Sequence, residues 1–412
     1  MNIAMFTRVM PAHCKGGMQD HILMLSEKIA EKGHTVVVIT TKHPEGKIYE
    51  EVNGVKIHYL PTTITGDYFR GGWWEKSVGK FMDMQSSKHF DIVHSQSAGG
   101  YYFLKKRLNK KCSLPAIVSM HGTTYDEIKT RLRLMSIKAP VHYIKSIGFI
   151  LDHIYQYFVY GLPLIRLSDA VISTSNEQAA IIKKIFFINE AKIFKVFNGI
   201  DPASFSPSSN IIIRQKRNMA PGENLLLSIA RLEKDKGIQN IIYALPDILK
   251  VFPDTKLMVV GDGSYAPELK KQVKKLKLES NVIFTGMLPF ESLPDYFNAC
   301  DLFINPTIRQ NGYDLTILEA MACEKPVVVS NIGSVPTVIE NGVDGLLVPT
   351  GDIKKLAEAI IRVLRDKELA ERLGKAARKK IVEKFSVESM VEGTLKVYEE
   401  VIRRNKEKLN QT

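Results

Sequence analysis

Cysteine is scarce in this chain of 412 residues. No CxxC pair is present, and the cysteines lie far apart in the sequence, at Cys14, Cys112, Cys300 and Cys323. This spacing argues against a disulfide framework and against a zinc site. It indicates reduced thiols in a cytoplasmic protein.

Long hydrophobic runs are also missing. No stretch of about 18 uninterrupted apolar residues occurs, so we expect no transmembrane helix. The first residues, Met1 to Phe6, soon give way to polar ones, so we expect no signal peptide. With 45% hydrophobic and 25% charged residues, the composition is that of a soluble globular protein. The length predicts two domains of about 200 residues each.

Acidic residues are fewer than basic ones, and the imbalance is local. The formal net charge is +13. Residues 101–150 contain 10 Lys and Arg against 2 Asp and Glu, whereas residues 201–412 contain 31 against 28. The local excess indicates an acidic partner, either anionic lipid headgroups or a phosphorylated acceptor, and nucleic acid is not expected. A solvated basic face without a partner is the alternative.

The dinucleotide fingerprint GxGxxG is absent, although the chain begins as a βαβ unit. Asn2 to Phe6 is an apolar run of strand length, Gln19–Lys32 has apolar residues at helical spacing, and Thr35–Thr40 is a second apolar run. This order is typical of a doubly wound sheet. The loop before the helix holds Gly16 and Gly17. They permit close backbone approach to a phosphate or sugar, or they form a plain turn.

A histidine follows another predicted strand of the first half. Ala116–Met120 is an apolar run that leads into His121. Ligand sites of open α/β sheets lie at the carboxyl ends of the strands, so His121 is a candidate site residue. A histidine satisfied by neighbouring backbone groups is the alternative.

Residues 124–167 are predicted to be a helical insert that is both basic and aromatic. Arg131 and Arg133 precede an apolar and aromatic stretch, residues 147–160, which Asp152 and His153 interrupt. The stretch is too polar to span a bilayer. It fits an interfacial helix near acidic headgroups, and it fits a core-packing helix equally well.

The second half repeats the alternation of strands and helices without repeating the sequence. We predict a first domain over residues 1–205, a second over 206–385, and a C-terminal amphipathic helix over 386–412. Leu225–Ala230 is an apolar strand followed by a charged loop with Arg231 and Lys236. These two cations could bind a diphosphate, or they could pair with the neighbouring acidic residues.

The stretch 305–322 has the order of a ligand site. A strand end leads into a polar loop with Gly312, and a helix begins near Leu315. Backbone N–H groups and the helix dipole there favour an anion, and Glu319 lies about one turn into the helix. A phosphorylated sugar donor fits this loop. Because no DxD triplet is present to hold a divalent ion, the two cations predict metal-independent transfer.

In their order and spacing, these motifs resemble the retaining glycosyltransferases of family 4. The matching segments are Gly16-Gly17, residues 121–123, Asn198 to Asp201, residues 230–237, Gly261 to Gly263, residues 318–328 and residues 342–348. The resemblance implies the GT-B fold. In that fold, two doubly wound Rossmann-like domains face each other across a deep cleft, and a C-terminal helix crosses back to the first domain.

The resemblance also implies roles for individual residues. Arg231 and Lys236 would bind the donor diphosphate, Glu319 the ribose, and His121 the donor sugar near the reacting carbon. No protein nucleophile is implied. The expected catalytic set is His121, Arg231, Lys236, Asn311 and Asp314; the expected donor-binding set is Gly16, Gly17, Arg231, Lys236, Gly312, Tyr313, Asp314, Leu315 and Glu319.

One departure from the family pattern concerns the donor sugar. The family has two glutamates eight positions apart, and the first of these is Asn311 here. The usual glycine two residues before Thr316 is Asp314. Asn311 can bind hydroxyls but carries no charge. Asp314 either supplies that charge or shapes the loop.

The predicted function is transfer of a hexose from a nucleoside-diphosphate sugar (a UDP- or GDP-sugar) to an acceptor sugar or lipid-linked acceptor, with retention. We expect no metal and no tightly bound cofactor. We also expect a cytoplasmic location with peripheral contact to an anionic membrane surface through residues 101–160. The alternatives are a nucleotide-sugar-binding protein with little or no transfer activity, and another enzyme of this fold such as an epimerase.

Overall fold

The structure is a computed structural model. It describes residues 1–14, 17–107, 113–135, 141–209, 212–220, 222–310 and 312–411, without the side chains of residues 134–135 and 141–146. Contacts divide the chain into two compact units. Unit 1 comprises Met1–Ile128, Ala139–Asn198 and Val387–Thr412, and unit 2 comprises Lys129–Lys138 and Gly199–Ser386.

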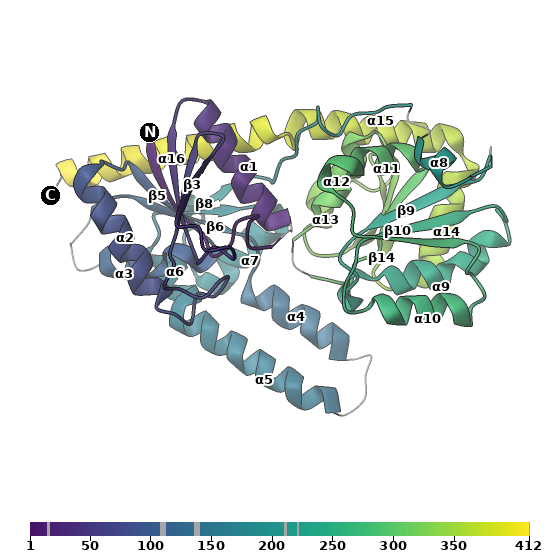
Figure 1. The fold of residues 1–412 in the computed structure, drawn as a ribbon, viewed down its shortest axis with the longest axis horizontal. Helices are drawn as coiled ribbons and strands as arrows, with labels where there is room; N and C mark the ends of the chain where they lie inside the picture. The colour runs from purple at the N-terminus through teal and green to yellow at the C-terminus, as the bar shows by residue number, and fades with distance from the viewer. Residues whose placement is uncertain are drawn as a thin grey trace. The chain divides into compact units, whose positions relative to one another are not determined.

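Unit 1 is built on an eight-stranded sheet in the order β3-β4-β2-β1-β5-β6-β7-β8 (Figure 1). All neighbouring strands are parallel except the edge pair β3 and β4. Most inner strands are apolar runs because both faces of the sheet are covered, and the exception is β5, which ends in His94, Ser95 and Gln96. The strands are β1 (Asn2–Phe6), β2 (Thr35–Thr40), β3 (Tyr49–Val52), β4 (Val55–Tyr59), β5 (Ile92–Gln96), β6 (Ala116–Met120), β7 (Ala170–Ser173) and β8 (Ile193–Lys195).

Helices cover both faces of this sheet, and α16, the last helix of the chain, lies on one of these faces. α16 packs beside α1, and its residues Val391 and Tyr398 are fully buried in the same core as Met5 of β1. The C-terminal helix thus packs on the N-terminal unit. The helices are α1 (Gly17–Glu31), α2 (Trp73–Ser87), α3 (Tyr101–Arg107), α4 (Thr124–Met135), α5 (Val141–Gln156), α6 (Leu162–Leu167), α7 (Asn176–Phe186) and α16 (Val387–Asn410), with a π-helical segment Tyr157–Gly161 between α5 and α6. From Lys129 on, the residues of α4 belong to unit 2.

Unit 2 contains a six-stranded, wholly parallel sheet in the order β11-β10-β9-β12-β13-β14. The strand order reverses between β9 and β12, so the helices that follow these two strands lie on opposite faces of the sheet. In α/β sheets, ligand sites form at this point, at the carboxyl ends of the strands. The strands are β9 (Leu225–Ile229), β10 (Lys256–Val260), β11 (Val282–Gly286), β12 (Leu302–Asn305), β13 (Val327–Asn331) and β14 (Leu346–Pro349).

The helices of unit 2 complete a second α/β layer structure. A large core joins the buried faces of α9 and α14 to β9, β10 and β12. The helices are α8 (Ile212–Lys216), α9 (Ile238–Leu249), α10 (Ala266–Lys275), α11 (Leu293–Ala299), α12 (Leu315–Ala322), α13 (Val335–Val338), α14 (Ile353–Arg365) and α15 (Lys367–Lys384). The predicted α/β class with two doubly wound units is confirmed.

Candidate functional site

The loop after β9 presents one exposed cation. Arg231 follows the strand directly, and its side chain is exposed. Its guanidinium makes no hydrogen bond or ion pair with any residue that the structure describes. Glu233, a neighbour with which it could pair, instead accepts a hydrogen bond from the Ser264 hydroxyl at 2.7 Å. Arg231 therefore remains available at the carboxyl edge of the unit 2 sheet.

Lys236, on the same loop, is buried and paired. Only 8% of this residue is exposed. Its ammonium group forms a short ion pair with the carboxylate of Asp314, which also accepts a hydrogen bond from Asn305 Nδ2 at 3.0 Å. Burial alone would raise the pKa of Asp314, but the charge and hydrogen bond of Lys236 leave that pKa below its ordinary value. The structure thus joins two predicted site residues that lie far apart in sequence.

Close backbone contact holds the Lys236 loop against the loop after β12. Gly237 has a φ of +73°, and a Cβ added there would lie 2.0 Å from the carbonyl oxygen of Pro306. The amide of Ile308 donates to the carbonyl of Asp235 at 2.9 Å, and the Thr307 hydroxyl donates to the same carbonyl at 3.1 Å. These contacts fix the position of Lys236 relative to the predicted donor loop.

Helix α12 begins at the end of that loop. Leu315 is its first residue, and Asp314 precedes it in an extended conformation. Gly312 has a φ of +63°, and its carbonyl accepts from the amide of Ser334 at 3.3 Å. Tyr313 is partly buried beside it. Glu319, in the second turn, is only 6% exposed, so it is not a solvent-facing glutamate of the helix start. Two predicted site residues, Gly16 and Asn311, lie outside the described residues.

In unit 1 the predicted histidine stands at the carboxyl edge of the sheet. His121 follows β6 directly, and its Nε2 lies 2.7 Å from Oε1 of Gln96, the last residue of β5. Its ring meets the ring of His21 edge-on, with centroids 5.3 Å apart. Burial lowers the pKa of His121 to about 4, so the imidazole is neutral at physiological pH.

Gly17 is the first residue of α1 and is exposed. His21 lies one turn further along and is 95% buried on this helix, with 5% exposed. Burial and the neighbouring His121 lower the pKa of His21 well below its ordinary value. The start of α1 and the end of β6 therefore come together in unit 1, as the sequence order of a doubly wound sheet predicts.

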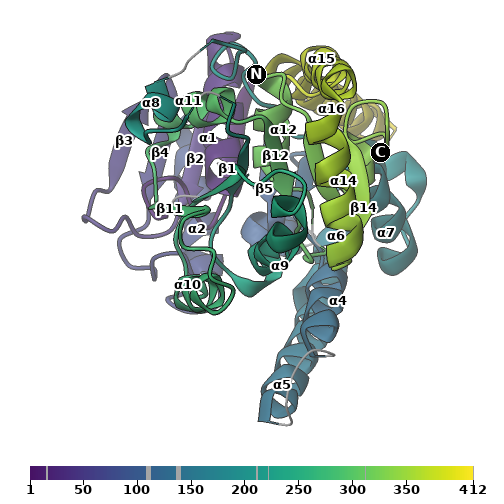
Figure 2. The ribbon, with the colours of Figure 1, turned by 90° about the vertical axis from the view of Figure 1, so that its right-hand side faces the viewer.

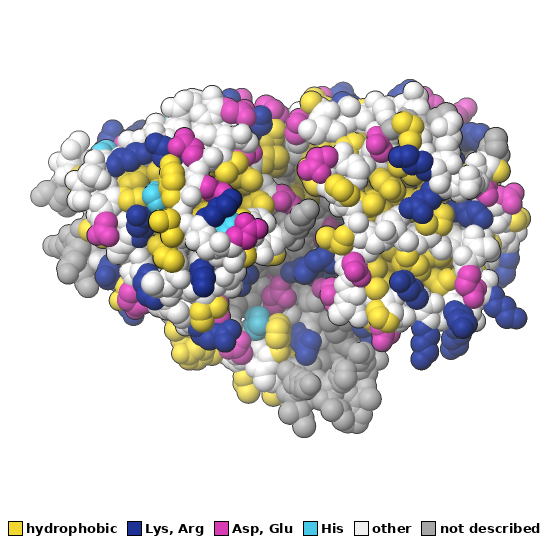
Figure 3. All heavy atoms as spheres, in the orientation of Figure 1, with side chains coloured by type: hydrophobic (Ala, Val, Ile, Leu, Met, Phe, Trp, Pro, Cys, Tyr) yellow, Lys and Arg dark blue, Asp and Glu magenta, His cyan; other side chains and the backbone are white. Residues whose placement is uncertain are grey.

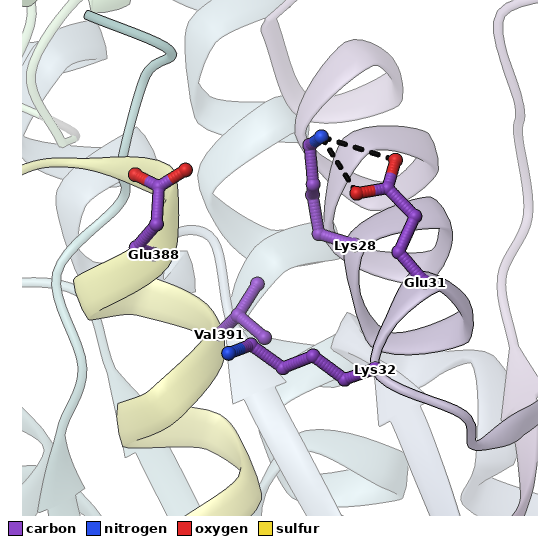
Figure 4. Close-up of a pocket in the computed structure, with 5 residues that line it drawn as sticks. All are labelled: Lys28, Glu31, Lys32, Glu388 and Val391. Carbon is purple, nitrogen blue, oxygen red and sulfur yellow. Dashed lines mark hydrogen bonds and ion pairs between the residues drawn. The ribbon is translucent and has the colours of Figure 1, made fainter.

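Unit 1 also contains a pocket that is separate from the predicted site residues. It has a volume of about 250 Å³ and is lined by Lys28, Glu31 and Lys32 of α1 and by Glu388 and Val391 of α16 (Figure 4). On one wall of the pocket, Lys28 Nζ forms an ion pair with Glu31 Oε2 at 2.8 Å. None of the predicted site residues lines this pocket, so we assign it no role in the site.

In the part of the chain that the structure describes, no group of three or more His, Cys, Asp or Glu side chains is arranged to hold a metal ion. Among the same residues, no helix has the length and apolar character needed to cross a membrane.

Sequence reasoning missed several residues that support the site. Asn305 and Gln96 each end a buried strand, at β12 and β5, and each contacts a predicted site residue. His94 precedes Gln96 on the same face of β5 and is fully buried. Polar residues within otherwise apolar strands are the signal that could have identified them.

The two α/β units have the architecture of the two-domain GT-B fold. Residues 15–204 match the family model "Glycosyltransferase Family 4", and residues 209–380 match "Glycosyl transferases group 1". The chain therefore belongs to this glycosyltransferase family, which confirms the resemblance seen in the sequence.

Individual relatives match most or all of the chain. A glycogen synthase of Mycobacterium tuberculosis is 31% identical, over 97% of this chain and 94% of its own. An alpha-monoglucosyldiacylglycerol synthase of Streptococcus pneumoniae is 28% identical, over 76% of this chain and 67% of its own. The solved structure of Anabaena HepE in complex with UDP-glucose has a TM-score of 0.71 at 18% identity, covering all of both chains, and shows the same fold.

Proposed function

We propose that the protein transfers a hexose from a nucleoside-diphosphate sugar to an acceptor, with retention of configuration and without a metal ion. The observation that carries this proposal is the pair of cations on one loop of unit 2. Arg231 is exposed and Lys236 is buried beside the start of α12. A helix start and two cations at the carboxyl edge of a parallel sheet suit a diphosphate.

The chemistry assigned to these residues is electrostatic. When the bond between the sugar C1 and the phosphate oxygen breaks, negative charge grows on the leaving diphosphate. Arg231 would offer planar N–H donors to it, and Lys236 a point charge, so both favour the departing group. The acceptor oxygen bonds to C1 on the same face, and its proton passes to the leaving phosphate oxygen. No protein nucleophile is needed in this scheme.

The remaining site residues receive roles in binding. Glu319 would accept hydrogen bonds from the ribose, His121 would contact the sugar near C1, and Gly17 would let the backbone approach the diphosphate. Asn311 would bind sugar hydroxyls. The structural similarity to HepE, whose solved complex contains UDP-glucose, supports a nucleotide sugar as donor.

The test is a transfer assay with a panel of UDP- and GDP-hexoses, with and without EDTA. We expect one donor to be consumed, equal rates in EDTA, and a product whose anomeric proton has the coupling of the donor. An inverted product would refute retention, and loss of activity in EDTA would refute metal independence. Tight binding of the donor without turnover would favour the alternative of a binding protein.

A lipid-linked or anionic acceptor at a membrane surface is the second part of the proposal. Helix α5 extends away from the sheet of unit 1 in both views (Figure 1, Figure 2). Helix α5 and the π-helical segment after it carry an exposed apolar stripe at helical spacing: Ile147, Leu151, Ile154, Tyr155 and Phe158. On the face shown in Figure 3, hydrophobic side chains gather along the lower margin of this unit. The Streptococcus pneumoniae relative is named as a monoglucosyldiacylglycerol synthase, and this glycolipid product supports a lipid acceptor for the present protein.

Basic side chains lie on the neighbouring helix α3. Lys105 and Lys106 are exposed, and the Lys106 ammonium lies 5.2 Å from the ring of Tyr102. Arg107 differs from them, because its guanidinium pairs with Asp169 and donates to the carbonyls of Leu114 and Leu167. Arg107 therefore stabilises unit 1, whereas the two lysines are free to meet anionic headgroups.

Co-sedimentation with vesicles tests this surface. We expect binding to vesicles that contain an anionic lipid, and weak binding to neutral ones. Leu151→Glu with Phe158→Glu should abolish binding, and Lys105→Gln with Lys106→Gln should weaken it. Met287→Glu is the matched control, since Met287 is equally exposed on unit 2. Binding that the Leu151 and Phe158 changes leave intact would refute the assignment.

A further inference from the structure

A line of polar side chains crosses the apolar core of unit 1 and ends at His121. Its members are Tyr398 of α16, His94 and Gln96 of β5, and His121 after β6. The first three are no more than 2% exposed. They lie in the core formed by Met5, Ile22 and Val391, where an inner strand would ordinarily carry only apolar residues. Such buried polar groups are costly unless every one is hydrogen-bonded.

Each link of the line has hydrogen-bond geometry. The Tyr398 hydroxyl lies 2.7 Å from His94 Nδ1. Gln96 Nε2 lies 3.3 Å from His94 Nε2, and Gln96 Oε1 lies 2.7 Å from His121 Nε2. The Ser119 hydroxyl, on the adjacent strand β6, also lies 2.7 Å from His94 Nε2. The line therefore connects the C-terminal helix to the carboxyl edge of the sheet without a gap.

The Gln96 amide indicates the direction of the hydrogen bonds along the line, and the Ser119 hydroxyl, which also contacts His94 Nε2, then donates to that nitrogen. The amide nitrogen of Gln96 lies 3.5 Å from the sulfur of Met5, a weak acceptor that suits an N–H donor and not a carbonyl oxygen. The amide oxygen then faces His121, so His121 Nε2 must carry the proton and donate it. The amide nitrogen faces His94, so His94 Nε2 accepts, and His94 Nδ1–H donates to the Tyr398 hydroxyl.

This assignment fixes the chemical character of His121. A neutral imidazole with its proton on Nε2 has one acceptor nitrogen, Nδ1. His121 Nδ1 has no hydrogen-bond partner within the described part of the chain. The edge-on ring of His21, itself nearly buried, limits rotation of the His121 ring. His121 is thus held as a hydrogen-bond acceptor rather than as a donor.

We propose that Gln96, held in turn by His94 and Tyr398, is a positioning residue that keeps His121 in the Nε2–H tautomer, so that Nδ1 accepts a hydrogen bond from a substrate hydroxyl. This inference rests on the proposed function for its substrate. The C-terminal helix α16 then contributes to the orientation of His121 through the side chains of Tyr398, His94 and Gln96.

The direct test is nitrogen NMR of the full-length protein labelled with ¹⁵N-histidine, with the His121 signals assigned by their loss in His121→Asn. In the native protein at pH 7 we expect Nε2 to be protonated and Nδ1 to be unprotonated. In Gln96→Leu we expect a mixture of tautomers. Tyr398→Phe, which removes only the distant hydroxyl, should shift the His121 tautomer equilibrium in the same direction by a smaller amount.

The kinetic test uses the same variants. Gln96→Leu should lower kcat about 10-fold to 100-fold with little change in the donor KM, as expected for loss of orientation. Gln96→Glu keeps an acceptor oxygen toward His121 and should restore the Nε2–H tautomer. Ser26→Ala is the matched control: Ser26 is fully buried and its hydroxyl approaches Met5, but it makes no contact with the line. We expect the native tautomer and rate in this variant.

Three outcomes would overturn the proposal. They are a native His121 signal with Nδ1 protonated, an unchanged tautomer in Gln96→Leu, and an altered tautomer with a native kcat. Failure of the proposed function would look different, because the native protein would transfer no sugar while the tautomer measurements would stand unaffected.

Discussion

The ion pair between Lys236 and Asp314 makes a specific prediction about Asp314→Asn. Asparagine has the same size, and its amide oxygen can still accept the hydrogen bond from Asn305. The substitution therefore removes one thing, the negative charge beside a buried ammonium group. In the native unit, Asp314 is the carboxylate that pairs with Lys236.

The magnitude follows from the burial of the pair. Removing one partner of a fully buried pair costs about 3–5 kcal/mol, because the other charge is left uncompensated. The Lys236 side chain is 9% exposed and the Asp314 side chain 24%, so some solvation remains. We therefore expect a loss of about 2–3 kcal/mol in the free energy of unfolding. For a unit of this size that corresponds to a fall in Tm of about 4–12 °C.

A nucleoside diphosphate should reverse much of this loss. If Lys236 binds the donor diphosphate, the phosphate supplies the missing negative charge in the variant, whereas in the native protein it must compete with Asp314. Differential scanning fluorimetry with UDP and GDP should therefore show a larger ligand-induced rise in Tm for Asp314→Asn than for the native protein. The measurement is made at low salt to limit screening.

Asp247→Asn is the control, because Asp247 pairs with Lys250 on the surface of the same unit. Exposed pairs of this kind contribute about 0.3–0.5 kcal/mol. The reasoning would be refuted if Asp314→Asn matched this control in Tm. Equal ligand-induced shifts in variant and native protein would refute the contact between Lys236 and diphosphate.

Three further predictions concern Arg231, the two buried histidines of unit 1, and Gly237. Arg231→Ala should reduce kcat/KM about 100-fold, as expected when one preorganised hydrogen-bond donor is lost. Its Tm should not change, because the Arg231 side chain is exposed. Near-native steady-state rates would count against a role of Arg231 in diphosphate binding. Burial lowers the pKa of His94 to about 3 and of His121 to about 4, so between these values and pH 6.5 the unfolded chain takes up protons that the folded one excludes. The free energy of unfolding therefore keeps this contribution above pH 6.5 and decreases as the pH is lowered, by about 2 kcal/mol per histidine at pH 5. His121→Gln should remove the contribution of His121 to the slope of Tm against pH, and an unchanged slope would contradict this. Gly237→Ala should cost about 2–4 kcal/mol, since its Cβ would overlap the Pro306 carbonyl; a native Tm would show that the two loops separate easily.

The inner strands of both units could be predicted from the sequence. Thr35–Thr40 and Ala116–Met120 have the same bounds in the structure as in the prediction. They lie inside parallel sheets covered on both faces, so every residue is apolar or small and the signal is continuous. The edge hairpin β3–β4 was missed because it has no continuous buried run: β3 alternates between exposed and partly buried residues, and β4 between buried and partly buried ones. Its turn, Asn53-Gly54, has positive φ at both residues and is a recognisable hairpin signal.

The pairing of site residues could not be predicted in the same way. The motifs identified Lys236 and Asp314 singly, but they are 78 positions apart, and only the packing of Gly237 on Pro306 brings their loops together. The contact between His94 and Tyr398 spans 304 positions. Contacts at such separations depend on the order of strands in the sheet, which hydrophobic periodicity does not specify.

The position of α16 in unit 1 has a consequence for how the protein is made. On the ribosome, the sheet of unit 1 is complete once Asn198 has emerged, yet the helix that covers part of it begins only at Val387. At about 5–20 residues per second, synthesis of the intervening segment takes roughly 10–40 s. During that interval the apolar face that receives Val391 and Tyr398 is uncovered, and His94 lacks its acceptor. The N-terminal unit therefore begins to fold first and finishes last, when its final helix arrives.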